Sequence, residues 1–138
     1  MESRSRAVVL GLLTLSGLYV GVWATGWPRG FYDTFPGFHR VWVGVDGPYN
    51  EHLVRDVGGL YLGLAVAGCV ALVLRQRAAF LVLGVAWTVF SIPHLAYHAS
   101  HLDEYDDLLD KVLNVVALGA TLLLALVLLL PARRSVAR

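Results

Sequence analysis

The chain has 138 residues, of which 57% are hydrophobic and 15% charged, and its mean hydropathy is +0.64. A water-soluble domain usually carries about 25% charged residues, so this composition argues against an ordinary soluble protein. The formal net charge is only +1 and the basic residues are few and scattered, which argues against a nucleic-acid partner.

Four apolar segments account for this composition and predict the fold. They are residues 7–24, 53–74, 78–98 and 108–130. Each is long enough to cross a bilayer, because about 20 apolar residues at about 1.5 Å per residue span roughly 30 Å of hydrocarbon. We predict an all-α, polytopic membrane protein, with residues 1–138 forming a single bundle of four transmembrane helices surrounded by the lipid bilayer.

The first apolar segment has a second interpretation. It follows Arg4 and Arg6 and ends near Val22-Trp23-Ala24, a pattern that a cleaved signal peptide also shows. Cleavage would leave three spans and would place the two termini on opposite sides of the membrane. The apolar run is longer than a typical signal core, so we expect a retained helix.

The connector between the first two spans, residues 25–52, is rich in aromatic side chains. Its rings belong to Trp27, Phe31, Tyr32, Phe35, Phe38, Trp42 and Tyr49. Such rings favour the headgroup level of a membrane. We therefore expect the connector to cap the bundle at the membrane surface, with a short helix near residues 37–45 and a turn at Asp46-Gly47-Pro48.

Charged residues are distributed unevenly between the two ends of the predicted bundle. Seven of the 11 basic residues fall at the end that holds both termini: Arg4, Arg6, Arg75, Arg77, Arg133, Arg134 and Arg138. The opposite end holds all five histidines and every acidic residue except Glu2. Because Lys and Arg favour the cytoplasmic side, we predict cytoplasmic termini and a histidine-rich end that faces outward.

Polar side chains recur at helical spacing on three of the spans. The sets are His52 and Asp56; His94, His98 and His101; and Asp107, Asp110, Asn114 and Thr121. Pro93 removes a backbone donor and predicts a kink that re-aims His94 and His98. Polar groups are costly against lipid, so we expect the three stripes to face one another inside the outward half of the bundle.

Converging imidazoles and carboxylates would form a metal site. Nitrogen and oxygen ligands suit zinc, iron, manganese or copper(II), and helical bundles build such sites from facing helices. The candidate ligands are His52, Asp56, His94, His98 and Asp110. A haem is a variant of this hypothesis, with His52 and either His94 or His98 as axial ligands. No HExxH or CxxCH motif is present, and both histidines of the third span have a plain alternative role in bonding the carbonyl freed by Pro93.

Two further hypotheses need no metal. An aromatic cap over a polar pocket would suit a quinone or a lipid head, in a membrane redox enzyme or an accessory protein. Alternatively, the chain is a structural subunit or a homo-oligomer. In that case the glycine-rich face of the second span, with Gly59 and Gly63, would be the docking face, because small residues let helices approach closely in lipid.

The run from Tyr49 to Gly63, YNEHLVRDVGGLYLG, resembles the second-span signature of small four-helix bacterial membrane proteins that are grouped loosely with DoxX-like proteins. Pro93-His94-Leu95-Ala96-Tyr97-His98 adds to the likeness, and the composition is similar to that of actinobacterial sequences. The resemblance implies a four-helix bundle in the bacterial inner membrane. Some DoxX-like proteins are linked to quinone-dependent sulfur oxidation, but Cys69 is the only cysteine here, so only the architecture is carried over.

Overall fold

A computed structural model describes residues 4–131 of the chain. In chain order the elements are α1 (Arg4–Gly26), α2 (Pro28–Thr34), β1 (Pro36–Gly37), β2 (Arg40–Val41), α3 (Glu51–Leu74), α4 (Arg77–Ser100), the 3-10 helix η1 (Leu102–Glu104) and α5 (Leu108–Leu129). Glu2, Arg133, Arg134 and Arg138, which entered the charge argument, lie outside the described residues.

The helices α1, α3, α4 and α5 are the four predicted spans. Each has 22 to 24 residues, and the mean hydropathy of its most apolar window lies between 1.8 and 2.7. Most of the side chains they expose are leucine and valine, which suits contact with lipid tails. The prediction of an all-α bundle is confirmed, and the chain is a multi-pass membrane protein.

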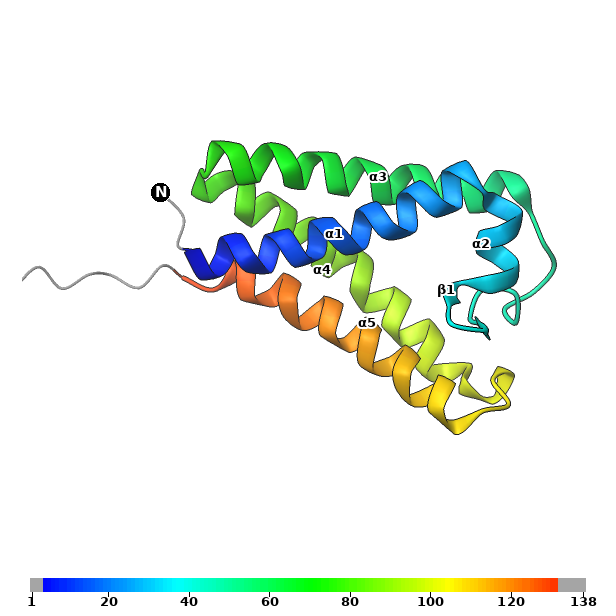
Figure 1. Cartoon of the computed structure of the whole chain (residues 1–138). Coiled ribbons are helices and arrows are strands. Elements are labelled where there is room, and N and C mark those ends of the chain that lie inside the picture. Colours follow the sequence, from blue (N-terminus) through cyan, green and yellow to red (C-terminus); the bar gives the residue numbers. More distant parts are fainter. Residues whose placement is uncertain (1–3, 132–138) are drawn as a thin grey trace, which may run out of the picture.

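The four spans form two close pairs, α1 with α3 and α4 with α5 (Figure 1). The pairs lie near each other at one end of the bundle, where α1 begins and α5 ends, and diverge toward the other end. We call the first the termini end. The second, which carries residues 27–50 and 101–107, is the connector end.

Small residues set the close contact between α1 and α3. A Cβ added to Gly58 would lie 2.7 Å from the backbone nitrogen of Thr25, and one added to Gly21 would lie 2.8 Å from that of Leu62. The two backbones therefore touch, as glycine permits in lipid. This contact fixes the rotation of α3, because the stripe through Gly58, Ala65 and Gly68 is buried and the face roughly 200° away points outward.

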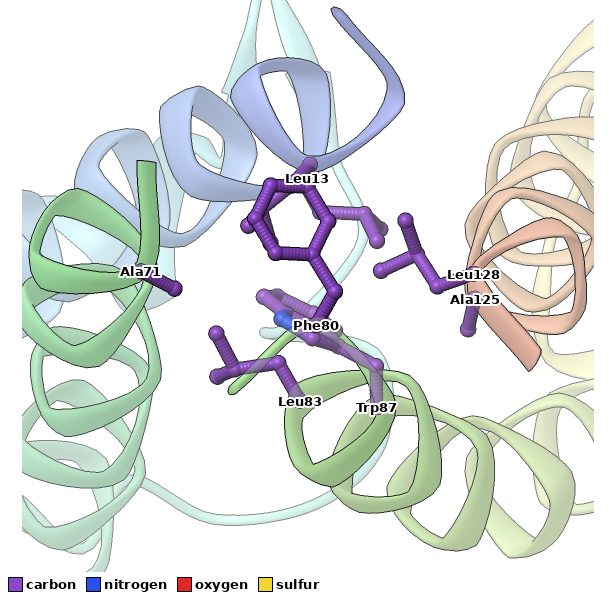
Figure 2. Close-up of a cluster of buried hydrophobic side chains, with 8 residues drawn as sticks. Leu13, Ala71, Phe80, Leu83, Trp87, Ala125 and Leu128 are labelled. Carbon is purple, nitrogen blue, oxygen red and sulfur yellow. The ribbon is translucent and has the colours of Figure 1, made fainter. Parts of the chain in front are cut away.

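A hydrophobic core fills the termini end. Its buried members are Leu10, Leu13, Ala71, Phe80, Leu83, Trp87, Ala125 and Leu128. They converge from all four spans (Figure 2). Arg77 Nη1 donates to the carbonyl of Leu128 at 2.7 Å and Arg6 Nη2 to that of Leu130 at 2.7 Å, which satisfies carbonyls that the end of α5 leaves without helical partners.

The connector folds as α2 followed by a β-hairpin. β1 pairs antiparallel with β2, and Gly37 lies opposite Arg40. Phe38 and His39 between them have φ angles of 58° and 61°, the left-handed values that both central residues of a type I′ turn adopt. Such residues cannot continue a right-handed helix, so the short helix expected near residues 37–45 was wrong.

Candidate functional site

A cavity of about 740 Å³ lies where the two helix pairs diverge, beneath the connector. Residues of α1, α2, α3, α4, α5 and the connector line it. Trp87 belongs both to the core and to the cavity wall, so it marks the boundary between the two ends. The volume falls within the roughly 300–1,000 Å³ of pockets that hold small molecules.

Aromatic rings form much of the cavity wall. They belong to Tyr19, Phe31, Tyr32, Phe35, Trp42, Tyr49, Tyr61, Trp87 and Phe90. Several pack edge to face or tilted against one another, as Phe31 and Phe35 do with ring centroids 4.6 Å apart. Among the residues that the structure describes, no lysine or arginine lines the cavity.

One face of α4 supplies three polar residues of the cavity wall. Ser91, His94 and His98 are spaced three and four residues apart, so they share that face, and all three line the cavity. The His94 ring stacks on Phe90 with centroids 5.0 Å apart and meets the edge of His98 at 4.8 Å. α4 contains Pro93 and continues to Ser100, so the structure brings His94 and His98 together as the sequence predicts.

The hydroxyl of Tyr105 joins the polar wall to the connector. It donates to the carbonyl of Trp42 at 3.2 Å, accepts from Asn114 Nδ2 at 3.1 Å and lies 3.4 Å from His98 Nδ1. Burial raises the pKa of Tyr105, which keeps the hydroxyl protonated. A hydroxyl has one proton, so when Trp42 receives it, His98 donates from Nδ1 and keeps Nε2 as an acceptor.

Four polar atoms on cavity-lining residues are buried and have no hydrogen-bond partner within residues 4–131. They are Trp87 Nε1, Ser91 Oγ, Asn114 Oδ1 and Asp46 Oδ1. Leaving a buried polar group unpaired costs about 1–3 kcal/mol. The cavity wall therefore contains polar side chains whose hydrogen-bonding capacity the described part of the protein does not satisfy.

Asp46 is the only carboxylate on the cavity wall in the described part of the chain. Burial raises the pKa of its carboxyl above the ordinary value of 3.8. Glu104 raises this pKa further, whereas His98 and His101 lower it. Sequence reasoning missed Asp46, because Asp-Gly-Pro indicates a turn and says nothing about which side chain faces inward. It also missed Tyr105, a single tyrosine in an acidic loop.

The predicted metal ligands do not come together. His52 Nε2 lies 3.2 Å from Asp56 Oδ2 on α3, but the two side chains are 86% and 57% exposed and do not line the cavity. Asp110 Oδ1 accepts instead from Arg40 Nη1 at 2.6 Å and from Trp42 Nε1 at 2.7 Å, which ties the connector to α5. Across residues 4–131, no three or more His, Cys, Asp or Glu side chains form a group that could hold a metal ion.

The predicted metal ligands fail to converge because of the way α3 is rotated about its axis. The glycine stripe through Gly58 packs on α1, which turns the stripe with His52 and Asp56 outward. The expected haem geometry fails for the same reason, because His52 lies outside the cavity. His94 and His98 approach from one helix only, whereas two axial ligands must bind from opposite faces of a haem.

The remaining polar residues of the predicted stripes are divided between structural roles and the cavity. His101 Nδ1 lies 2.8 Å from the carbonyl of Tyr97 and does not line the cavity. Asp107 Oδ1 caps α5 by accepting from the backbone nitrogen of Leu109 at 2.9 Å. Asn114 and Thr121 do line the cavity, so that part of the predicted seam of α5 faces inward.

Comparison of the chain with protein-family models, with curated proteins and with solved structures found no match. The function is therefore inferred from the cavity and from the side chains that form its wall.

Proposed function

We propose that this protein binds a small lipophilic molecule with a polar end, of the class that includes quinones and lipids, in the cavity at the connector end. One observation carries the proposal. Four buried polar atoms without partners, on Asp46, Trp87, Ser91 and Asn114, lie around a cavity that is otherwise aromatic and apolar. A ligand whose polar end hydrogen-bonds these side chains, once they turn toward the cavity, removes their desolvation cost, and its apolar body fills the space between the rings.

Access from the bilayer supports a lipophilic ligand. Leu53 and Val57 of α3 line the cavity, yet they are 59% and 36% exposed. The cavity is thus bordered by side chains that also reach the outer surface of the bundle, where the two helix pairs diverge. A molecule dissolved in the membrane could enter by this side without crossing water.

The orientation that we propose follows from the arginines. Arg4, Arg6, Arg75 and Arg77 lie at the termini end, which favours the cytoplasmic side for that end. The cavity would then open in the outer leaflet of a bacterial inner membrane. Because the connector carries Trp27 and Phe38, which are 69% and 89% exposed, it suits the headgroup level.

Calorimetric titration tests the proposed function. Protein purified in a nonionic maltoside detergent is titrated with three decyl compounds, namely decyl-benzoquinone, decanol and decyltrimethylammonium, with protein-free micelles as the blank. We expect saturable binding of at least one compound. Thr121→Phe and Ser91→Leu, which add bulk inside the cavity, should weaken it.

Leu123→Phe is the matched control, because Leu123 lies on the same helix as Thr121, is 65% exposed and does not line the cavity. This variant should bind like the wild type. Absence of saturable binding for all three compounds, or equal binding by the filled and control variants, would overturn the proposal.

A second candidate function is self-association or docking in a membrane complex through α3. Gly59 and Gly63 lie on the exposed face of α3, where an added Cβ would meet nothing within 4 Å, so another helix has room to pack against them. Gly63→Leu should then abolish a cross-linked dimer in membranes, whereas Gly119→Leu, at an equally open position on α5, should leave it intact. If neither variant changes the cross-linking pattern, this face has no docking role.

A further inference from the structure

The charges around the cavity narrow the class of ligand. Of the described residues that line it, Asp46 alone carries a carboxylate, and none carries a lysine or arginine side chain. An anionic ligand would therefore meet no positively charged lysine or arginine on the wall. A neutral ligand would leave the Asp46 carboxylate without a counter-charge in a desolvated site, where an unpaired charge is costly.

The aromatic rings that line the cavity on the connector side have the chemistry that binds cations. Trp42, Tyr32 and Tyr49 line the cavity on the connector side, and Asp46 lies in the same connector. The negative face of an aromatic ring attracts a cation within about 6 Å, most strongly when water is excluded. Arg29 already uses two of these rings, because its guanidinium lies 5.6 Å from the Tyr32 centroid and 5.0 Å from that of Tyr49.

Arg29 does not neutralise Asp46. Its Nε lies 2.8 Å from Asp33 Oδ2, so its charge is already paired, and it does not line the cavity. Asp46 Oδ1 in turn is buried and accepts no hydrogen bond from any described residue. Burial also raises the pKa of the Asp46 carboxyl, and His98 and His101 offset this only in part, so the ionised form would gain further stabilisation from a cation.

We propose that the cavity selects a lipophilic cation, an alkylamine or a quaternary ammonium group, whose positive charge is held by the Asp46 carboxylate and the neighbouring aromatic rings. This inference rests on the proposed ligand-binding function and names its ligand class. The alkyl part lies among the apolar walls of the four spans. The same chemistry is offered by a free alkylamine and by the amine or choline headgroup of a phospholipid.

The experiment compares ligands with one tail and different heads. Decyltrimethylammonium, decylamine, decanol and decanoate are titrated into the full-length protein in maltoside micelles, with protein-free micelles as the blank. We expect the two cations to bind about tenfold or more tightly than decanol, and decanoate to bind most weakly. A short-chain phosphatidylcholine and its choline-free phosphatidylglycerol counterpart form a second arm, which distinguishes a lipid headgroup from a free amine.

Variants of Asp46 test whether its carboxylate holds the positive charge of the ligand. Asp46→Asn should remove most of the preference for decyltrimethylammonium over decanol, and Asp46→Glu should restore part of it. Asp103→Asn is the control, because it removes one negative charge from an exposed position at the same end without touching the cavity. It should keep the wild-type preference.

The outcomes separate this inference from the function on which it depends. If decanol or decyl-benzoquinone binds saturably and as tightly as the cations, or if Asp46→Asn keeps the preference for cations, the cationic ligand class is wrong but ligand binding stands. If decanoate binds best, the inference is equally overturned. If no compound binds saturably, or if the filled variants bind as Leu123→Phe does, the proposed function fails with it.

Discussion

The two ends of this bundle are built from the same four helices but are packed differently. At the termini end, Leu10, Phe80 and Leu128 are fully buried and all four helices contribute to one hydrophobic cluster. At the connector end α1 and α3 stay packed through a second hydrophobic cluster, Ala24, Phe31 and Val54, but the two helix pairs diverge and a cavity with unpartnered polar atoms lies between them. The difference teaches that packing between the two helix pairs is concentrated at the termini end, whereas the connector end leaves space between them.

Two phenylalanines of α4 test this difference between the two ends. They should give the largest change in the free energy of unfolding. Phe80 is 0% exposed in the core, so Phe80→Ala should lower the free energy of unfolding by about 3–5 kcal/mol. Phe90 is only partly buried and borders the cavity, so Phe90→Ala should cost clearly less. Reversible unfolding in mixed detergent micelles measures both values. Equal costs would mean that the cavity wall is as tightly packed as the core.

Neighbouring glycines of α3 give the next largest effect. A methyl group at Gly58 would press on the backbone of Thr25, whereas a methyl group at Gly59 would meet nothing within 4 Å. Gly58→Ala should therefore destabilise the protein by about 1–3 kcal/mol, as overpacking does. Gly59→Ala should be neutral or slightly stabilising in the same unfolding assay. The opposite order would mean that α3 packs on α1 through its other face.

The link between the connector and α5 allows a local test. Asp110 accepts from both Arg40 and Trp42, so Asp110→Asn should loosen the connector without disturbing the core. We expect several-fold faster amide hydrogen exchange in residues 36–46 and unchanged exchange around Phe80. Asp103→Asn, which removes an exposed charge nearby, is the control. Uniformly faster exchange across α4 and α5 would show that the two ends are not independent.

The sequence was sufficient to predict the spans because hydropathy and length are properties of single segments. The expected segments 53–74 and 78–98 agree within two residues at each end with α3 and α4. The rotation of α3 was harder to predict, since Gly58 and Gly68 compete with Gly59 and Gly63 as candidate packing stripes. Only the contact with α1 decides between them, and the wrong choice placed His52 and Asp56 inside the bundle.

The candidate site was predictable only where it lies on one helix. Helical spacing put His94 and His98 on a common face, and the structure keeps them together. Asp46 and Tyr105 come from irregular segments, where no periodicity tells which way a side chain points. The hairpin was missed for a related reason, because Phe38 and His39 adopt left-handed angles that non-glycine residues rarely show.

A change at Asp46 should have the smallest effect on stability, and this effect is specific to the connector end. Its carboxyl has a pKa above 3.8 in the folded protein because it is desolvated. As the pH rises from the unfolded-state pKa to the folded-state pKa, the unfolded chain releases its proton first, so this group lowers stability across that window. Above the folded-state pKa the loss of stability caused by Asp46 is constant, and below the unfolded-state pKa this loss vanishes.

Asp46→Asn removes this titration and leaves the other ionisable groups in place. The variant should therefore gain thermal stability over the wild type above the window and lose that gain at pH values below 3.8. Melting temperatures of the two proteins, measured in parallel from acidic to neutral pH without added amine, check the difference. A wild type that becomes the more stable of the two as the pH rises would mean that the carboxylate has a donor within the protein. The charge at the connector end would then be satisfied without a ligand.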